Sequence, residues 1–515
     1  MPALAWHRLG GYLRETQLLG SIQSTLYWDQ NTRMPSGGAA WRGEQLSLLA
    51  TQIHARQSSS HFESLLEEAE SEFQLEQRSG DMSLEEIGER SRNLELLKQD
   101  LIRQQRLDPC LVGNLAKAKS DGYNQWQQAR DVVDFNFFAP ALKNLIALRQ
   151  EQAKQLSEPR SCWETLAQPF EPDLSLTRLE ELFEPLRAKL PVLVEKVRTW
   201  GSPSREKWDL EVSAQENLCS ELLKDWGQDP AITCVARSPH PFSITLGPCD
   251  FRLTTRVVPG QPFSCFLATA HEWGHSLYEQ GLPNLSHQWF AWPLGQATSM
   301  GVHESQSLFW ENRVARSQGF SERWWTKFAN FHAPINSAAD FWRLINPLTP
   351  GLNRVEADEL SYGLHILIRT DLEIAMLEGG LPVEDLPLEW NRRYTELLGV
   401  TPKNDLEGCL QDVHWSEGLF GYFPSYLLGH LISAQIADAM AKDLIEDGAN
   451  ENDPINSLIA EGSEAKILKW LRANVHPLGR QVNAEQLVKK VSCEELSSRP
   501  FLRYLEDKLE RLHFA

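Results

Sequence analysis

Apolar residues recur three and four positions apart along most of the chain, which is the spacing of amphipathic helices. Residues 84–107 and 174–200 show it clearly, with charged residues between the apolar ones. Ser83 and Glu86 stand where a capping box would begin the first of these helices. Breaks rich in proline or glycine interrupt the helical pattern at "AQPFEPD" (167–173), "GSPSREKW" (201–208) and "NPLTPGLN" (346–353).

The stretch 231–258 has a different pattern. It contains β-branched residues, prolines and short alternation, which predict a small hairpin or sheet. Helical periodicity returns after residue 262, and the chain has neither a repeat at solenoid spacing nor a long low-complexity linker. Residues 1–515 are therefore predicted to form a single, mainly α-helical domain with a minor β element.

Composition narrows the range of partners and the compartment. The 515 residues are 42% hydrophobic and 23% charged, as in a soluble globular protein, and the formal net charge is −20. This charge argues against nucleic acids and anionic membranes as partners. The chain lacks a signal-like start and an apolar stretch of membrane-spanning length. Its eight scattered cysteines contain no C-x-x-C pair, so we expect a cytoplasmic protein.

The sequence "PFSCFLATAHEWGHSLYEQG" (262–281) carries the main candidate for chemistry. Pro262 suits the first turn of a helix and Gly281 its C-terminal cap. His271 and His275 are one helical turn apart, so both imidazoles can reach one ion, and Glu272 can serve as general base. The alternative is an ordinary helix with two polar-face histidines, because this pattern arises by chance in roughly a few per cent of such chains.

A catalytic zinc ion usually takes three protein ligands and keeps one position for water. Glu304 lies 29 residues after His275, in a second helical segment that could return antiparallel to the first. His303 is the competing ligand. Adjacent helical residues diverge by about a quarter turn, so only one of the two should face the ion. The spacing favours neither.

Several motifs accompany the two helices in a fixed order. They are "LYWDQNTRMP" (26–35), "HPF" (240–242), "DFRLT" (250–254), "HEWGH" (271–275), "GVHESQSLFWEN" (301–312), "NRVEADELSYGLH" (353–365) and "HWSEGLFGYFPSYLLG" (414–429). Together they resemble the carboxypeptidase Taq family of metallocarboxypeptidases, and the resemblance covers essentially the whole chain. It implies a helical, two-lobed metallopeptidase with a deep central groove, the lobes sharing one core. It also implies a homodimer and one divalent ion per chain, expected to be zinc although cobalt also serves.

The resemblance assigns the third ligand to Glu304 rather than His303. Its implied activity is release of C-terminal residues from peptides with a free C-terminal carboxylate, by attack of metal-activated water with Glu272 as base. In "HWSEGLFGYFPSY" it points to His414 and Tyr426 as stabilisers of the oxyanion, with Tyr422 as the alternative tyrosine. Simple packing is the competing interpretation of both tyrosines.

A carboxypeptidase must also bind the terminal carboxylate, and arginine does so bidentately. The resemblance favours Arg354 for this role, although Asn353 stands where the family commonly has isoleucine or valine. It places Arg252 near the substrate, and His240 is a further candidate to line the site. Structural roles compete for each of them: Arg252 paired with Asp250, Arg354 paired with Glu356 or Asp358, and His240 as a buried, hydrogen-bonded histidine.

Two other functions fit the same residues. An endo-acting oligopeptidase would use the same metal site, and a non-catalytic helical peptide-binding protein would retain the motif without the activity. Peptides with free and amidated C-termini distinguish the first, and metal analysis with a hydrolysis assay distinguishes the second.

Overall fold

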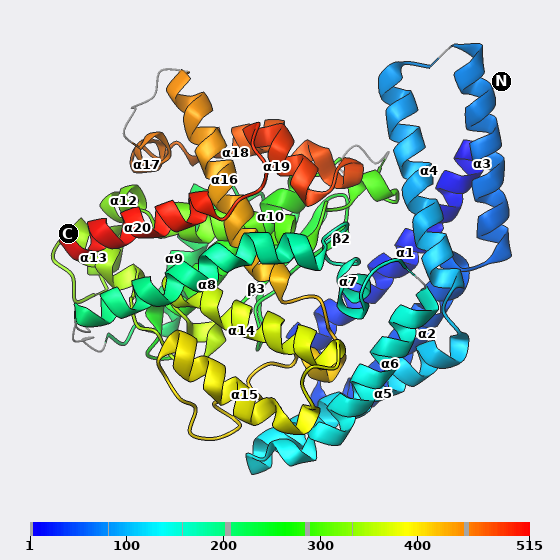
Figure 1. Cartoon of the computed structure of the whole chain (residues 1–515). Helices are drawn as coiled ribbons and strands as arrows, with labels where there is room; N and C mark the ends of the chain where they lie inside the picture. Colours follow the sequence, from blue (N-terminus) through cyan, green and yellow to red (C-terminus); the bar gives the residue numbers. More distant parts are fainter. Residues whose placement is uncertain are drawn as a thin grey trace.

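The computed structural model describes residues 4–80, 82–156, 158–200, 208–283, 289–331, 333–446 and 453–514. Helices dominate it, as the periodicity predicts (Figure 1). The first nine are α1 (Leu4–Thr32), α2 (Ala39–Gln57), α3 (Ser60–Ser79), α4 (Leu84–Gln105), α5 (Pro109–Val132), α6 (Ala139–Leu156), α7 (Cys162–Ala167), α8 (Leu176–Thr199) and α9 (Val212–Asp225). They are followed by α10 (Pro262–Gly281), α11 (Met300–Leu308), α12 (Gln318–Ala329), α13 (Ala338–Ile345), α14 (Glu359–Leu377), α15 (Leu386–Arg393), α16 (Pro424–Glu446), α17 (Pro454–Ala460), α18 (Glu464–Asn474), α19 (Ala484–Ser492) and α20 (Arg499–Phe514).

The signals around the first two periodic stretches are confirmed where the structure describes them. Ser83 and Glu86 form the expected capping box at the start of α4, and α8 occupies the second periodic stretch. The break at 167–173 separates α7 from α8, and 346–353 is irregular. The break at 201–208 lies almost wholly outside the described residues.

The predicted β element is a three-stranded sheet. Its strands are β1 (Thr233–Arg237), β2 (Ser243–Gly247) and β3 (Asp250–Thr255), in the order β1-β3-β2. β2 and β3 form an antiparallel hairpin, whereas β1 runs parallel to β3. Phe251 and Leu253 of β3 are buried, and Thr255 at its end donates a hydrogen bond to a carbonyl of α10. The sheet therefore supports the helix that carries both candidate histidine ligands.

The buried apolar residues form two clusters. The larger one extends from α5 to α20 and includes the inner faces of α8, α10, α14 and α16. The smaller one joins α1, α3 and α4 and is closed by Trp289 and Trp292, with Trp292 stacked on Trp6 at 4.3 Å. The N-terminal helices thus have a core of their own beside the main one.

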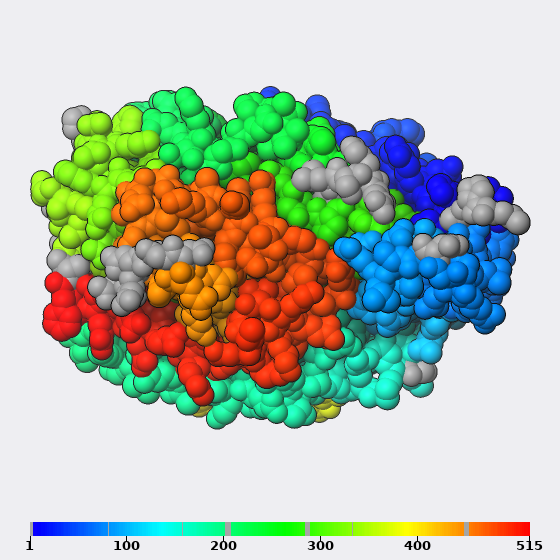
Figure 2. Space-filling model, turned by 90° about the horizontal axis from the view of Figure 1, so that it is seen from above, coloured from blue at the N-terminus to red at the C-terminus, as the bar shows by residue number. Residues whose placement is uncertain are grey.

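Helices far apart in sequence meet around the middle of the molecule. α16 is buried along most of its length and packs on α11, and in Figure 1 it crosses the centre of the view. In Figure 2 the N-terminal helices, in blue, occupy one end, while segments from α16 onward, in orange and red, spread over the visible face. Among the described helices, none combines the length and apolar character needed to span a membrane.

Candidate metal centre

α10 and α11 approach each other very closely at Gly274, the fourth residue of "HEWGH". A Cβ atom at this position would lie 2.7 Å from Cα of Ser307 and 2.8 Å from the carbonyl oxygen of Gln306. Backbone cannot rotate away as a side chain can, so only glycine fits the crossing as it stands. The close approach brings the middle of α11, with Glu304, opposite the two histidines of α10.

Gly281 has a different role from the predicted one. α10 includes Gly281, and its C-cap is Leu282 in an extended conformation, so the prediction of a glycine cap is wrong. A Cβ at Gly281 would lie 2.0 Å from Nδ1 of His476. The residue is small because a buried histidine packs against the helix there.

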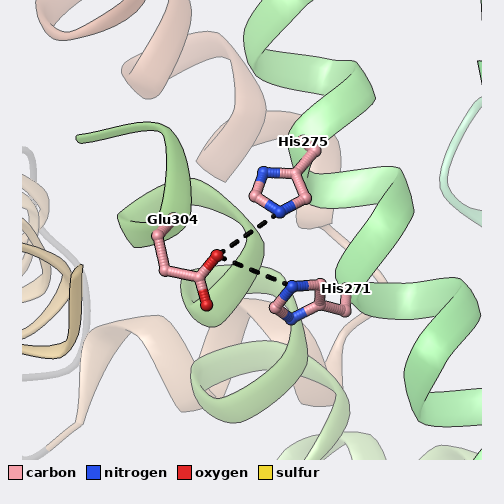
Figure 3. Close-up of side chains that lie close together, drawn as sticks. All are labelled: His271, His275 and Glu304. Atoms are coloured by element: carbon pink, nitrogen blue, oxygen red, sulfur yellow. Dashed lines mark ion pairs between the residues drawn. The ribbon is translucent and has the colours of Figure 1, made fainter. Parts of the chain in front are cut away.

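The side chains of His271, His275 and Glu304 converge, as Figure 3 shows. Oε2 of Glu304 lies 3.7 Å from Nε2 of His271 and 3.5 Å from Nε2 of His275. One ligand atom from each residue falls within 4.8 Å of the other two, and among the described residues this is the one such group of histidine, cysteine or acidic side chains. Two ligands bound at about 2.05 Å to a tetrahedral ion would lie about 3.4 Å apart. The observed spacing is close to that value.

Each histidine is oriented by a hydrogen bond at its other ring nitrogen. Nδ1 of His271 lies 2.9 Å from Oε2 of Glu311, and Nδ1 of His275 lies 3.1 Å from the carbonyl oxygen of His303. Both partners accept, so each Nδ1 donates a hydrogen bond, and the Nε2 atoms are the ring nitrogens that face Glu304. Metal-binding histidines usually have such a partner.

The electrostatics of the cluster favour a cation. Burial opposes a charge on His271, but Glu304 and Glu311 outweigh it and raise the pKa of His271 to about 10. Burial likewise opposes ionisation of Glu304, yet the two histidines lower the pKa of Glu304 to about 2. The carboxylates of Glu272, Glu304 and Glu311 all act on His271, and Glu311 also pairs with the guanidinium of Arg316. With both histidines neutral, as metal ligands are, the three ionised carboxylates and the guanidinium carry two net negative charges.

Glu272, the expected base, is buried on α10 beside the first histidine. Burial raises the pKa of Glu272 to about 7, with the charge of His271 acting in the opposite direction. A carboxylate with a pKa near neutrality can both accept and release a proton at neutral pH.

His303, the competing ligand, has its own partners. Its Nε2 lies 3.0 Å from Oε1 of Glu279, and Oε2 of Glu279 accepts a hydrogen bond from Thr245 of β2. The His303 ring packs against that of His275 with centroids 4.5 Å apart. Its side chain is therefore engaged with Glu279, while its backbone carbonyl supports His275.

No sequence pattern singles out Glu311. It lies on a π-helical turn, Phe309–Ala315, that continues α11. Its Oε1 accepts a hydrogen bond from Arg316 at 3.0 Å, and Arg316 also donates to the carbonyl of Ile345 at the end of α13. π-turns are rare in proteins, and those that occur are often found at functional sites. The sequence pattern cannot distinguish a π-turn from an α-helix.

A second polar group forms around Arg354. Its Nε and Nη2 lie 2.8 Å from the same oxygen of Asp412, and its Nη1 lies 3.3 Å from the hydroxyl of Tyr362. The guanidinium stands 5.3 Å from the centre of the Tyr426 ring. Neither Glu356 nor Asp358 is its partner: Asp358 instead caps α14. No sequence motif points to Asp412, which also binds the fully buried Arg369.

His414, Tyr422 and Tyr426 lie together beside this arginine. Nε2 of His414 is 3.2 Å from the hydroxyl of Tyr426, and the two tyrosine rings are 5.3 Å apart. Burial lowers the pKa of His414 to about 3, so the ring is neutral at neutral pH. Burial also raises the pKa of Tyr426 well above its usual value, with smaller contributions from Tyr422 and Glu304. The Tyr426 hydroxyl therefore remains a proton donor.

The two groups are neighbours through α16. At Gly429, three residues after Tyr426, a Cβ would lie 2.7 Å from Cγ of Glu304. The side chain of Glu304 thus rests against the backbone of the helix that carries Tyr426.

Arg252 and His240 lie on the sheet side. Nε and Nη2 of Arg252 lie 2.8 and 2.7 Å from the two carboxylate oxygens of Asp250, which is the ion pair expected of a structural arginine. Its guanidinium also stands 5.6 Å from the centre of the buried Trp28 ring. His240 is exposed, between β1 and β2, and its carbonyl accepts a hydrogen bond from Ser238.

One buried carboxylate joins the starts of α11 and α16. Glu171 accepts hydrogen bonds from the backbone N–H of Gly301 and from the hydroxyl of Ser425. Burial raises the pKa of Glu171 to about 7. Through these two hydrogen bonds the carboxyl group links the N-terminal ends of the helices on which Glu304 and Tyr426 lie.

Comparison with known proteins shows where the chain belongs. A model of the family described as carboxypeptidase Taq (M32) metallopeptidase matches residues 8–509. The chain belongs to this family. The family recognised from the motifs is thereby confirmed, and the protein is a metal-dependent carboxypeptidase, a hydrolase of peptide bonds.

Several carboxypeptidases resemble it over nearly their full length. Thermostable carboxypeptidase 1 of Thermus thermophilus is 36% identical, covering 99% of each chain, and carboxypeptidase 1 of Bacillus subtilis is 32% identical, covering 95% of this chain and 94% of the relative. The crystal structure of the M32 carboxypeptidase from Deinococcus radiodurans R1 superposes with a TM-score of 0.91 at 31% identity, over 99% of this chain and 100% of that one.

Proposed function

We propose that His271, His275 and Glu304 hold one zinc ion, and that this centre removes residues from the C-terminus of peptides. The observation that carries the proposal is the convergence of three ligand atoms within 4.8 Å, with Glu272 on the same helix. The donor set fits zinc, which takes imidazole nitrogens and carboxylate oxygens. The two net negative charges of the surrounding groups would balance a divalent cation.

A bound divalent ion supplies a Lewis acid that polarises a carbonyl and activates water at neutral pH. Glu272 accepts the proton of the attacking water and delivers it to the leaving amine. His414 and Tyr426 stabilise the oxyanion that forms: the protonated hydroxyl of Tyr426 donates a hydrogen bond to it, and the neutral His414 holds that hydroxyl through Nε2 at 3.2 Å. Tyr422 is the alternative donor, because its ring lies 5.7 Å from that of His414.

Arg354 binds the terminal carboxylate of the substrate. Asp412 occupies its Nε and one hydrogen of Nη2, and the Tyr362 hydroxyl occupies one hydrogen of Nη1. Each terminal nitrogen keeps a second hydrogen for a substrate carboxylate. Arg354, Arg369 and Asp412 together carry one net positive charge, which one substrate carboxylate would neutralise. Arg252 is already in a bidentate ion pair with Asp250, so we assign it a supporting place near the substrate, and we assign His240 the outer edge of the site.

The test is mass spectrometry of a peptide, with its free C-terminus or amidated, digested with and without chelator. A carboxypeptidase shortens only the free form, one residue at a time, and chelator stops it. Internal cleavage of both forms would instead support an endo-acting oligopeptidase. Glu304→Ala should lose bound metal, and unchanged metal content would shift the assignment to His303.

We also propose a cytoplasmic homodimer. All eight cysteines are free thiols, as expected in a reducing compartment, and the dimer is proposed from the family resemblance. Light scattering during gel filtration measures the mass directly, and a monomeric mass at working concentration would contradict the proposed dimer.

A further inference from the structure

We propose that Glu311 is a positioning residue that fixes His271 as a metal ligand, and that Arg316 holds Glu311 in that position. The inference rests on the proposed metal centre and goes beyond it, because neither Glu311 nor Arg316 belongs to the set that binds the ion.

The first observation is the hydrogen bond of His271. Its Nδ1 lies 2.9 Å from Oε2 of Glu311 and donates to this carboxylate, so Nε2 is the ring nitrogen left for the ion, and it faces Glu304. An imidazole turned about its Cβ–Cγ bond would present Nδ1 or a carbon instead. A carboxylate also makes the opposite nitrogen a stronger ligand than a neutral acceptor would.

The second observation is how Glu311 itself is held. Its other oxygen accepts a hydrogen bond from Arg316 at 3.0 Å, and that arginine donates to the carbonyl of Ile345 at 2.7 Å. The carbonyl of Arg316 accepts hydrogen bonds from Trp342 and Asn346. The carboxylate is therefore fixed by a chain of contacts that ends on α13, and a flexible surface glutamate would not be.

The third observation is the backbone at this point. Glu311 is seven residues after Glu304, a spacing that in a regular α-helix returns to nearly the same face. The helix changes to a π-turn at Phe309–Ala315, which widens the turn between the two glutamates. Glu304 thus contacts His271 at Nε2 while Glu311 contacts the same ring at Nδ1.

The experiment measures the metal dissociation constant of the full-length protein by competition with a chelator. Glu311→Gln keeps an acceptor for Nδ1 but removes the charge and the acceptor for Arg316. Glu311→Met keeps the volume but removes the charge and both acceptors. We expect the affinity for zinc to fall about 10-fold in the first variant and about 100-fold in the second. Glu322→Gln, on the exposed face of α12, is the matched control and should bind zinc like the wild type.

Thermal unfolding of the metal-free proteins separates positioning from folding. A graded loss of affinity, with Glu311→Gln unfolding at the wild-type temperature, supports the inference. Wild-type affinity in both Glu311 variants overturns it. If the proposed metal centre itself were wrong, the result would be different, because zinc binding would also survive Glu304→Ala.

Discussion

Gly274→Ala adds one methyl group at the crossing of α10 and α11. The new Cβ would lie 2.7 Å from Cα of Ser307, and ordinary contact begins at 3.4 Å, so the helices must separate by about 0.7 Å. Overpacking of this kind costs about 1–3 kcal/mol. Replacing a helical glycine by alanine contributes about 1 kcal/mol in the opposite direction, which would mask part of the clash.

Gly43→Ala removes this ambiguity. Gly43 lies in α2 and is exposed, and a Cβ atom added there would meet nothing within 4 Å, so alanine gains only helix propensity. The difference in stability between the two variants therefore isolates the clash at about 1–3 kcal/mol. Thermal unfolding in the presence of chelator should give a lower midpoint for Gly274→Ala than for Gly43→Ala.

The same displacement acts on the metal centre. Moving α11 outwards lengthens the 3.5 and 3.7 Å separations between Glu304 and the two histidines. A loss of 1.4 kcal/mol in binding free energy is tenfold in affinity, so we expect zinc to bind at least about tenfold more weakly. If Gly274→Ala unfolds at the same temperature as Gly43→Ala and binds zinc like the wild type, the reasoning about this crossing is wrong.

Three further predictions follow from other groups. Glu272→Gln should retain zinc but lose hydrolysis by about 10²–10⁴-fold, measured by metal analysis and peptide turnover; an active variant would contradict its role as base. Arg354→Lys should lower kcat/KM for peptides with a free C-terminus by about 10–100-fold, as expected for a lost charged hydrogen bond, with zinc content unchanged as the control. Burial raises the pKa of Glu171 to about 7 from an ordinary 4.5, so the folded state holds this proton more tightly and wild-type stability falls as pH rises between these values. The unfolding midpoint of metal-free Glu171→Gln should therefore rise relative to that of the metal-free wild type between pH 5 and 8. A difference between the two midpoints that stays constant over this range would refute the prediction.

Features set by neighbouring residues could be predicted from the sequence. The capping box of Ser83 and Glu86, the helical periodicity and the β-rich stretch 231–258 all depend on short-range patterns, and the structure confirms them. The strand order could not be predicted, because the parallel pairing of β1 with β3 depends on how the sheet packs against α10.

The candidate site divides in the same way. The separation of His271 and His275 follows from helix geometry alone, whereas the partner of Arg354 is Asp412, 58 residues further along the chain. Glu311 needs both a π-turn and the crossing of two helices to reach His271. The prediction of a cap at Gly281 is wrong for the same reason. The small size of this residue allows a contact with His476 that the local sequence does not reveal.

The two histidines of the centre differ in what stands behind them. His275 is held by a main-chain carbonyl, which is present whatever residue occupies position 303, whereas His271 is held by a side chain. Substitution can therefore adjust the strength of one ligand while the other stays constant. Exchanging the acceptor at position 311 offers a way to tune how firmly this enzyme retains its ion without altering a ligand, the base or the residues that receive the substrate.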